Sequence, residues 1–206
     1  FEEKKITNIE FLNSINRYCN WLVQKGVSSG DKIVLSDIKS PIFDSLCYAI
    51  WSIGAVLVII DDKIELKKLD YKLIIDLNSL PDSKTIDSYS SKYITTKNVL
   101  LNDAAVEYYH NEKGIILSHY NLLINTYGIL KELNILHNET LQITIPNIST
   151  TYIVLHTILP LYAGTSISKT NPNITFGIDG QFDYNIQFEW KSFRDTKPQS
   201  LYVLPE

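Results

Sequence analysis

The chain has 206 residues, of which 45% are hydrophobic and 20% are charged, a balance typical of a globular protein rather than of a disordered chain. Its net charge of -4 and its scattered lysines argue against a nucleic-acid partner or a polybasic membrane anchor, because both need concentrated Lys and Arg. No apolar run approaches the roughly 20 residues that a membrane span needs. We therefore expect a cytoplasmic protein with no membrane span.

The two cysteines, Cys19 and Cys47, each fall on the apolar face of a predicted helix. Cysteines in such positions behave as small buried hydrophobic residues. The sequence therefore predicts free thiols, which suit a reducing compartment. The chain contains no methionine, and one hypothesis for this is that the sequence is incomplete.

The first predicted helix begins at a capping box formed by Thr7 and Glu10. In this motif each side chain accepts a hydrogen bond from a backbone NH at the start of the helix. Apolar residues then recur at helical spacing until Gly26, which we expect to be a left-handed cap. A short buried strand is predicted at Lys32–Leu35.

The second predicted helix starts with Ser40 as its N-cap and Pro41 as its first helical residue. It ends before Gly54, and the run Ala55–Ile60 follows, which is apolar at every position. Such runs are typical of strands covered on both faces in parallel sheets.

A further buried strand is predicted at Tyr71–Ile75. The polar stretch Asn78–Ser91 follows, and its serines and aspartates predict a surface connection. We take its end as a boundary, with a first α/β subdomain at residues 1–91 and a second at residues 92–206.

The second subdomain is organised around Asp103–Leu130. An apolar, aromatic-rich run breaks at His110–Gly114, resumes at Ile115–Leu117 and becomes helical after Ser118, for which N-capping is the simplest role. Such a break either closes a hairpin or holds an anion. The order strand, polar break, strand and helix makes this stretch a plausible ligand site.

The elements predicted after this stretch are a helix to about Leu136, strands at Leu141–Ile145, Thr165–Ser168 and Ser200–Leu204, an apolar segment at Tyr152–Tyr162 and a helix at Ile186–Phe193. A loop is expected around Pro172, Gly177 and Gly180. The alternation of strands and helices predicts an α/β fold of two βαβ-type subdomains, with largely parallel sheets flanked by helices.

Two histidines invite a chemical role. His119 begins a helix without an acidic or nucleophilic neighbour in sequence, so an exposed first-turn histidine is the expectation. His156 lies in an apolar segment, and we expect a satisfied core histidine.

Five segments resemble, in order, the landmarks of the adenylate-forming superfamily, which comprises acyl-CoA synthetases, nonribosomal adenylation domains and luciferases. They are ITNIEFLNSINRYCNWLVQKGVSSGDKIVLS, AIWSIGAVLVIIDD, YYHNEKGIILSHYNLL, ITIPNISTTYIVLHTILPLYAGTSIS and FEWKSFRDTKPQSLYVLPE. The third is similar to the family's signature YTSGTTGxPKGVxlSHxNL, and its second half is nearly identical. The resemblance implies the N-terminal domain fold of these enzymes, without the C-terminal domain that brings a catalytic lysine.

One departure from the family pattern lies in the phosphate loop. Between Tyr109 and Glu112 the family places a Ser/Thr/Gly-rich segment whose NH groups and hydroxyls surround the ATP phosphates, whereas this chain has only His110 and Asn111. A phosphate cradle needs many converging NH donors and glycines that allow close approach. Either the loop is degenerate, or part of it is missing from the sequence as given.

The resemblance implies two groups of site residues and no protein metal ligands, since Mg²⁺ would be held through the ATP phosphates. The nucleotide group is Tyr109, His110, Asn111, Glu112, Lys113 and Gly114. The substrate pocket group is Ser149, Thr150, Thr151 and Tyr152. A solvated hairpin lysine, an ordinary turn glycine and a hydroxyl-rich helix start are the structural alternatives for these residues, and no catalytic residue is assigned.

The function implied by the resemblance is that of an ATP-dependent carboxylic acid ligase. Such an enzyme activates a small carboxylic acid as an acyl-adenylate, releases pyrophosphate and passes the acyl group to a thiol of CoA or of a phosphopantetheinyl carrier protein. The alternative is a noncatalytic relative that keeps the fold as a binding or scaffolding module. The sequence leaves open the acid, the thiol and the oligomeric state.

Overall fold

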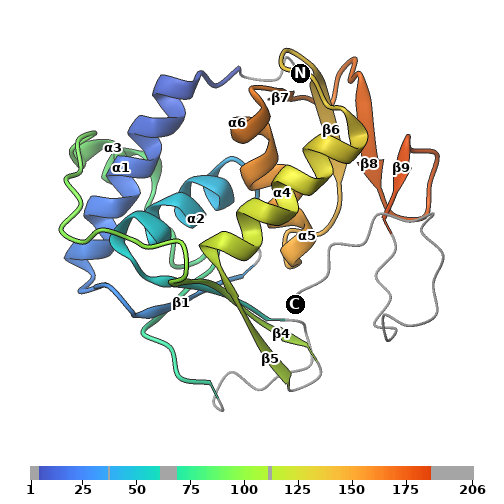
Figure 1. Ribbon diagram of the computed structural model, residues 1–206. Coiled ribbons are helices and arrows are strands. Elements are labelled where there is room, and N and C mark those ends of the chain that lie inside the picture. The colour runs from blue at the N-terminus through green and yellow to red at the C-terminus, as the bar shows by residue number, and fades with distance from the viewer. Residues whose placement is uncertain (1–4, 37, 61–68, 111–112, 187–206) are drawn as a thin grey trace. The chain divides into compact units, whose positions relative to one another are not determined.

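The computed structural model describes residues 5–36, 38–60, 69–110 and 113–186 (Figure 1). The chain divides into two compact units, Phe1–His119 and Tyr120–Glu206. This division differs from the boundary expected after residue 91. The reason is that a strand following this boundary, β4 at Ala104–His110, pairs with β2 at Val56–Ile60 and so completes the first sheet.

The first unit opens with helix α1, Asn8–Gln24, and the predicted capping box is confirmed. The Thr7 hydroxyl accepts a hydrogen bond from the Glu10 NH at 3.2 Å, and the Glu10 carboxylate accepts one from the Thr7 NH at 2.8 Å. Gly26 follows the helix with a φ of 81°, as expected of a left-handed cap.

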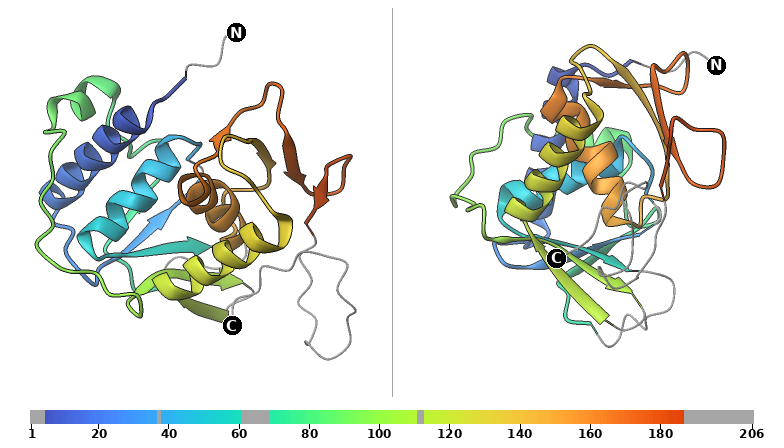
Figure 2. Two further views of the ribbon diagram at one scale, coloured as in Figure 1. Left: turned by 45° about the horizontal axis from the view of Figure 1, so that its top comes forward. Right: turned by 45° about the vertical axis from the view of Figure 1, so that its right-hand side comes forward.

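Helix α2, Ile42–Ile53, packs beside α1 (Figures 1 and 2). The prediction that Ser40 caps this helix was wrong. The Pro41 carbonyl accepts a bond from the Ser45 NH at 3.0 Å, so Pro41 is the N-cap and no side chain caps the helix. Gly54 ends the helix in the left-handed conformation, as predicted. Cys19 and Cys47 are buried free thiols on these two helices, which confirms the expectation for both.

The first sheet has the strand order β3-β1-β2-β4-β5. The strands not yet placed are β1 at Lys32–Leu35, β3 at Leu73–Ile75 and β5 at Lys113–Ser118. The first four strands of this order run parallel and β5 is antiparallel to β4. The sheet is therefore largely parallel, as predicted, and β2 is buried almost throughout.

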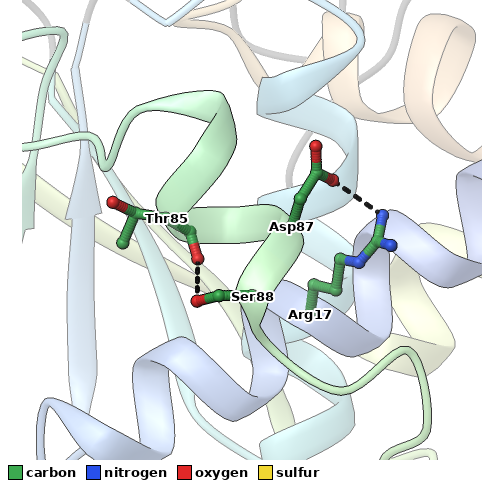
Figure 3. Close-up of polar contacts among 4 residues, drawn as sticks. All are labelled: Arg17, Thr85, Asp87 and Ser88. Atoms are coloured by element: carbon green, nitrogen blue, oxygen red, sulfur yellow. Dashed lines mark hydrogen bonds and ion pairs between the residues drawn. The ribbon is translucent and has the colours of Figure 1, made fainter.

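The polar connection contains a short helix, α3 at Ser83–Ser88, which the sequence reasoning did not predict. Asp82 caps it by accepting a hydrogen bond from the Thr85 NH. Figure 3 shows how α3 is held, with Asp87 paired to Arg17 of α1 at 3.0 Å and Ser88 donating to the Thr85 carbonyl. The Arg17–Asp87 ion pair thus links the polar connection to α1.

Helix α4, His119–Leu133, starts at the last residue of the first unit and otherwise belongs to the second unit, which contains a parallel sheet of order β7-β6-β8-β9. Its strands are β6 at Thr140–Thr144, β7 at Ser166–Ile167, β8 at Ile174–Gly177 and β9 at Tyr184–Asn185. The apolar segment between β6 and β7 is helical, with α5 at Thr150–Tyr152, a π-helical stretch at Ile153–Ile158 and α6 at Leu159–Ala163.

The expected loop around Gly177 and Gly180 was partly wrong, because β8 and β9 fall within it. The ring of Phe182 packs against both glycines, and a Cβ atom at either position would come within 2.5 Å of a ring atom. The absence of side chains at these positions therefore allows the connection between β8 and β9 to pack closely on Phe182. The helix predicted at Ile186–Phe193 and the strand predicted at Ser200–Leu204 lie outside the described residues, apart from Ile186. Among the helices that are described, none is long and apolar enough to cross a membrane.

Candidate functional site

The polar break in the central stretch closes a hairpin. Strands β4 and β5 pair in antiparallel register up to His110 and Lys113, so two residues connect the paired ends. These two residues, Asn111 and Glu112, and the side chains of His110 and Lys113 lie outside what the structure describes. Of the two expectations for the break, the hairpin is confirmed and anion binding stays a prediction.

Tyr109 and Gly114 face each other across the hairpin. A Cβ atom on Gly114 would lie 2.7 Å from Cε1 and 3.1 Å from Cζ of the Tyr109 ring, closer than such atoms approach each other. The aromatic ring therefore lies over a position where only glycine fits. By resemblance, Gly114 would let the backbone come close to a phosphate. The structure shows that Gly114 also leaves room for the Tyr109 ring.

A buried carboxylate lies two residues before Tyr109 on the same strand. Glu107 is only 6% exposed, and its Oε1 accepts a hydrogen bond from the Tyr109 hydroxyl at 2.5 Å. Its Oε2 lies 2.7 Å from the Lys32 ammonium of β1. Because β2 lies between β1 and β4, this ion pair bridges over a strand.

The environment of Tyr109 keeps its hydroxyl protonated. Burial raises the pKa of Tyr109 to about 12, and the hydrogen bond to Glu107 and the negative charges of Glu107 and Asp70 act in the same direction. Tyr109 is therefore a neutral hydrogen-bond donor at physiological pH, and its proton is already directed at Glu107.

Sequence reasoning missed Glu107 and Lys32. One signal was present, because Glu107 is the only charged residue in the strand sequence AAVEYYH. A lone carboxylate in an apolar strand predicts a buried partner. The identity of that partner depends on the strand order, which the sequence does not specify.

His119 is half-buried rather than exposed, which corrects the expectation for it. Its ring meets Trp51 edge-on with centroids 6.0 Å apart, and the Trp51 Nε1 donates to the Ala105 carbonyl at 2.9 Å. Burial lowers the pKa of His119, and the nearby charge of Asp103 opposes the shift. These contacts make His119 a neutral packing residue where α4 begins.

The four predicted pocket residues form the start of α5 in the second unit. Ser149 caps this helix, since its hydroxyl accepts from the Tyr152 NH at 3.1 Å and donates to the Pro146 carbonyl at 2.9 Å. Thr150, Thr151 and Tyr152 are buried. Ser149 thus has the structural role that was its alternative, and an acid pocket at these residues stays a prediction.

His156 is 8% exposed and lies in the π-helical stretch. It stacks on Tyr152 with ring centroids 4.4 Å apart and an interplanar angle of 12°. The expectation of a core histidine is confirmed.

In the part of the chain that the structure describes, no three His, Cys, Asp or Glu residues come together in a way that could hold a metal ion. A nucleotide site at Lys113 and Gly114 stays a prediction. Only two residues separate the paired positions His110 and Lys113, and two residues carry few NH groups to surround a triphosphate.

No family model matches the sequence, and no curated protein matches it.

Several solved structures have a similar fold. A fatty acyl CoA synthetase of Mycobacterium tuberculosis is 15% identical with a TM-score of 0.70, over 80% of this chain and 39% of that one. ATP-bound MatB from Rhodopseudomonas palustris is 17% identical with a TM-score of 0.69, over 84% and 44% of the two chains. The N-terminal domain of FACL13 from Mycobacterium tuberculosis is 16% identical with a TM-score of 0.63, over 77% and 48%.

The match covers less than half of each of these structures. At these identities the likeness establishes the fold alone. It agrees with the α/β fold of two largely parallel sheets that the sequence resemblance implies. The chain therefore shares its fold with part of these structures, among them the N-terminal domain of FACL13.

Proposed function

We propose that this chain is part of an ATP-dependent carboxylic acid ligase. The observation that supports the proposal is the β4–β5 hairpin, whose second strand carries Lys113 and Gly114 and leads directly into α4, in a fold shared with an acyl CoA synthetase. This is the position that the sequence resemblance assigns to the end of a phosphate loop. The solved structure of MatB with a similar fold is an ATP-bound one, which supports ATP as the nucleotide.

In the proposed reaction a carboxylate oxygen attacks the α-phosphorus of ATP, and the bond to pyrophosphate breaks. The thiol of CoA or of a carrier protein then attacks the acyl carbon, and AMP leaves. Lys113 would supply a point charge to the triphosphate, and Gly114 would allow the backbone to come close to it. Mg²⁺ would be held through the ATP phosphates, and Ser149–Tyr152 would contribute to the acid pocket.

Because the hairpin connection is short, we expect weak binding of ATP. A hydrogen bond to a charged group contributes about 1.5–3 kcal/mol, so each missing NH donor weakens phosphate binding considerably. We therefore expect a KM for ATP near the upper end of the usual range, at about 1 mM. A cytoplasmic location is part of the proposal, supported by the buried free thiols Cys19 and Cys47.

A second candidate function is a noncatalytic binding or scaffolding module. The sequence between the paired strand ends favours it, because only Asn111 and Glu112 lie between His110 and Lys113, and two residues carry few NH groups for a phosphate cradle. The module would keep the fold and bind partners without turning over ATP.

Acid-dependent exchange of labelled pyrophosphate into ATP separates the two candidates. The purified full-length protein that contains this chain, with its intact mass determined, would be assayed with Mg-ATP and a panel of short-chain, long-chain and aromatic carboxylic acids. The ligase predicts exchange with at least one acid and loss of that exchange in Lys113→Ala, while Lys131→Ala on the exposed side of α4 behaves as wild type. No exchange with any acid would leave the module as the better account.

A further inference from the structure

Three polar side chains form a continuous chain of contacts in the first sheet. The Lys32 ammonium lies 2.7 Å from one oxygen of Glu107, and the Tyr109 hydroxyl donates to the other oxygen at 2.5 Å. Lys32 lies on β1, and the other two residues lie on β4. The chain of contacts therefore links the middle of the sheet to the end of the hairpin.

Glu107 is in an unfavourable position for a charge. Its side chain is 7% exposed, against 33% for Lys32. Its Oε2 atom accepts no well-directed hydrogen bond within the described residues, so its charge is compensated mainly by the Lys32 ammonium. An apolar residue of similar size would be expected to stabilise such a strand at least as well, since buried ion pairs contribute little net stability. Stability alone therefore does not account for Glu107.

What Glu107 does achieve is the orientation of Tyr109. A hydrogen bond from a hydroxyl to a carboxylate is short and strong, and it fixes the phenol oxygen at one end of the ring. The other contact of the ring is Gly114 on β5, where a Cβ atom would come within 2.7 Å of Cε1. The Tyr109 ring is thus held at its hydroxyl by Glu107 of the same strand, and it packs on Gly114 of β5.

We propose that Glu107, held by Lys32, is a positioning residue that acts through Tyr109 to keep the ends of β4 and β5 closed. The effect on nucleotide binding rests on the proposed ligase function, whereas the effect on the hairpin does not. Lys113 and Gly114 form the start of β5. When the paired ends of β4 and β5 are well ordered, the backbone of these two residues has a fixed geometry for any ligand bound there.

Amide hydrogen exchange of the ligand-free protein tests the proposal directly. Glu107→Gln removes the charge but keeps the shape, and Tyr109→Phe removes only the hydroxyl. We expect both to accelerate exchange at residues 108–110 and 113–115, Tyr109→Phe by about tenfold because it loses the charge-assisted hydrogen bond, and Glu107→Gln by up to about tenfold because it leaves only a weaker, neutral one. Exchange in β1 and β2 should change by less than about twofold, because the network acts locally.

The matched controls are Glu132→Gln and Tyr127→Phe, which make the same chemical changes at exposed positions of α4. Both should leave exchange of the hairpin unchanged. Rates at the strand ends that stay at the wild-type value in Glu107→Gln and Tyr109→Phe would overturn the proposal. An equal acceleration throughout the first sheet would also overturn it, because Glu107 would then be a general stabilising residue.

A second measurement connects the network to ligand binding. If wild type shows pyrophosphate exchange, Glu107→Gln should raise the KM for ATP by about tenfold while kcat stays within about twofold, because a positioning residue acts on binding geometry. Lys32→Arg should retain most of the wild-type KM, since it keeps the positive charge. An unchanged KM in Glu107→Gln would contradict the positioning role. If wild type shows no exchange, the ligase proposal fails and the hydrogen-exchange result alone decides on the network.

Discussion

The ring of Tyr109 lies against the backbone of Gly114 so closely that a Cβ atom on residue 114 would come within 2.7 Å of the Tyr109 Cε1 atom. The two residues are register partners at the end of the β4–β5 hairpin. The glycine is therefore required by the packing of its partner and not by an unusual backbone dihedral.

Replacing this glycine should destabilise the protein. We expect Gly114→Ala to lower the free energy of unfolding by about 1–3 kcal/mol, the usual effect of forcing a methyl group into a filled space. Chemical denaturation measures the change. In a Tyr109→Ala background the same substitution should cost much less, because the clashing ring is gone.

The matched control is Gly128→Ala in α4, where a Cβ atom would meet nothing within 4 Å. There we expect a gain of about 0.5–1 kcal/mol from the better helix propensity of alanine. If Gly114→Ala were as well tolerated as Gly128→Ala, the close packing of Tyr109 on Gly114 would be refuted.

The capping box of α1 gives a second prediction. Thr7 and Glu10 satisfy each other's backbone NH groups at the start of the helix. We expect Thr7→Ala to lower the free energy of unfolding by about 1 kcal/mol. The exposed Thr96 offers the same substitution away from a helix start, and Thr96→Ala should change stability by less than about 0.5 kcal/mol. Equal effects of the two substitutions would mean that the cap contributes nothing.

The raised pKa of Tyr109 predicts that the free energy of unfolding falls at alkaline pH. Its pKa is raised to about 12 in the folded protein from an ordinary value of 10.0, so between these values the folded state holds a proton that the unfolded state has released. Stability from this group is therefore complete below about pH 10 and falls as the pH rises toward about 12. Because the pKa values of Tyr18 and Tyr48 are also raised, wild type must be compared with Tyr109→Phe.

Urea denaturation at several alkaline pH values makes this comparison. The loss of stability with rising pH should be smaller in Tyr109→Phe than in wild type. Absorbance titration of the phenols provides a second readout, since the difference between the two proteins should titrate well above pH 10. Identical pH dependence of stability in the two proteins would show that Tyr109 titrates as a free phenol.

The lowered pKa of His119 predicts that the free energy of unfolding falls as the pH is lowered in the acid range. Burial lowers its pKa below the ordinary 6.5, so the unfolded state takes up a proton before the folded state does. Stability from His119 is complete above about pH 6.5 and is lost as the pH falls through its folded value. His119→Gln should therefore flatten the fall in unfolding free energy between about pH 7 and pH 5, a range that denaturation can follow. The same change at the exposed His137 is the control, and an equal flattening there would contradict the assignment to His119.

Much of the fold follows from local signals in the sequence. The capping box fixed the start of α1, and Gly26 and Gly54 marked the ends of α1 and α2. The run of apolar residues in β2 predicted a strand buried on both faces. These features depend on residues close together in the chain, so their physical reasons can be recognised without the structure.

Other features depend on contacts between distant residues. Strands β8 and β9 are short and lie among glycines, and β8 is a strand because it pairs with β6. The ion pair between Lys32 and Glu107 exists because the strand order places β1 and β4 on either side of β2. In the candidate site the sequence identified Tyr109 and Gly114, but their contact and the role of Glu107 required the register of the hairpin.

Equilibrium binding of Mg-ATP to the folded protein, followed by calorimetry, tests the proposed function most directly. The ligase predicts saturable binding with a Kd of about 1 mM or lower, competition by pyrophosphate, and weaker binding in Lys113→Ala than in Lys131→Ala. A folded protein that binds no Mg-ATP at about ten times this concentration would contradict the ligase and leave a module that keeps the fold without the nucleotide.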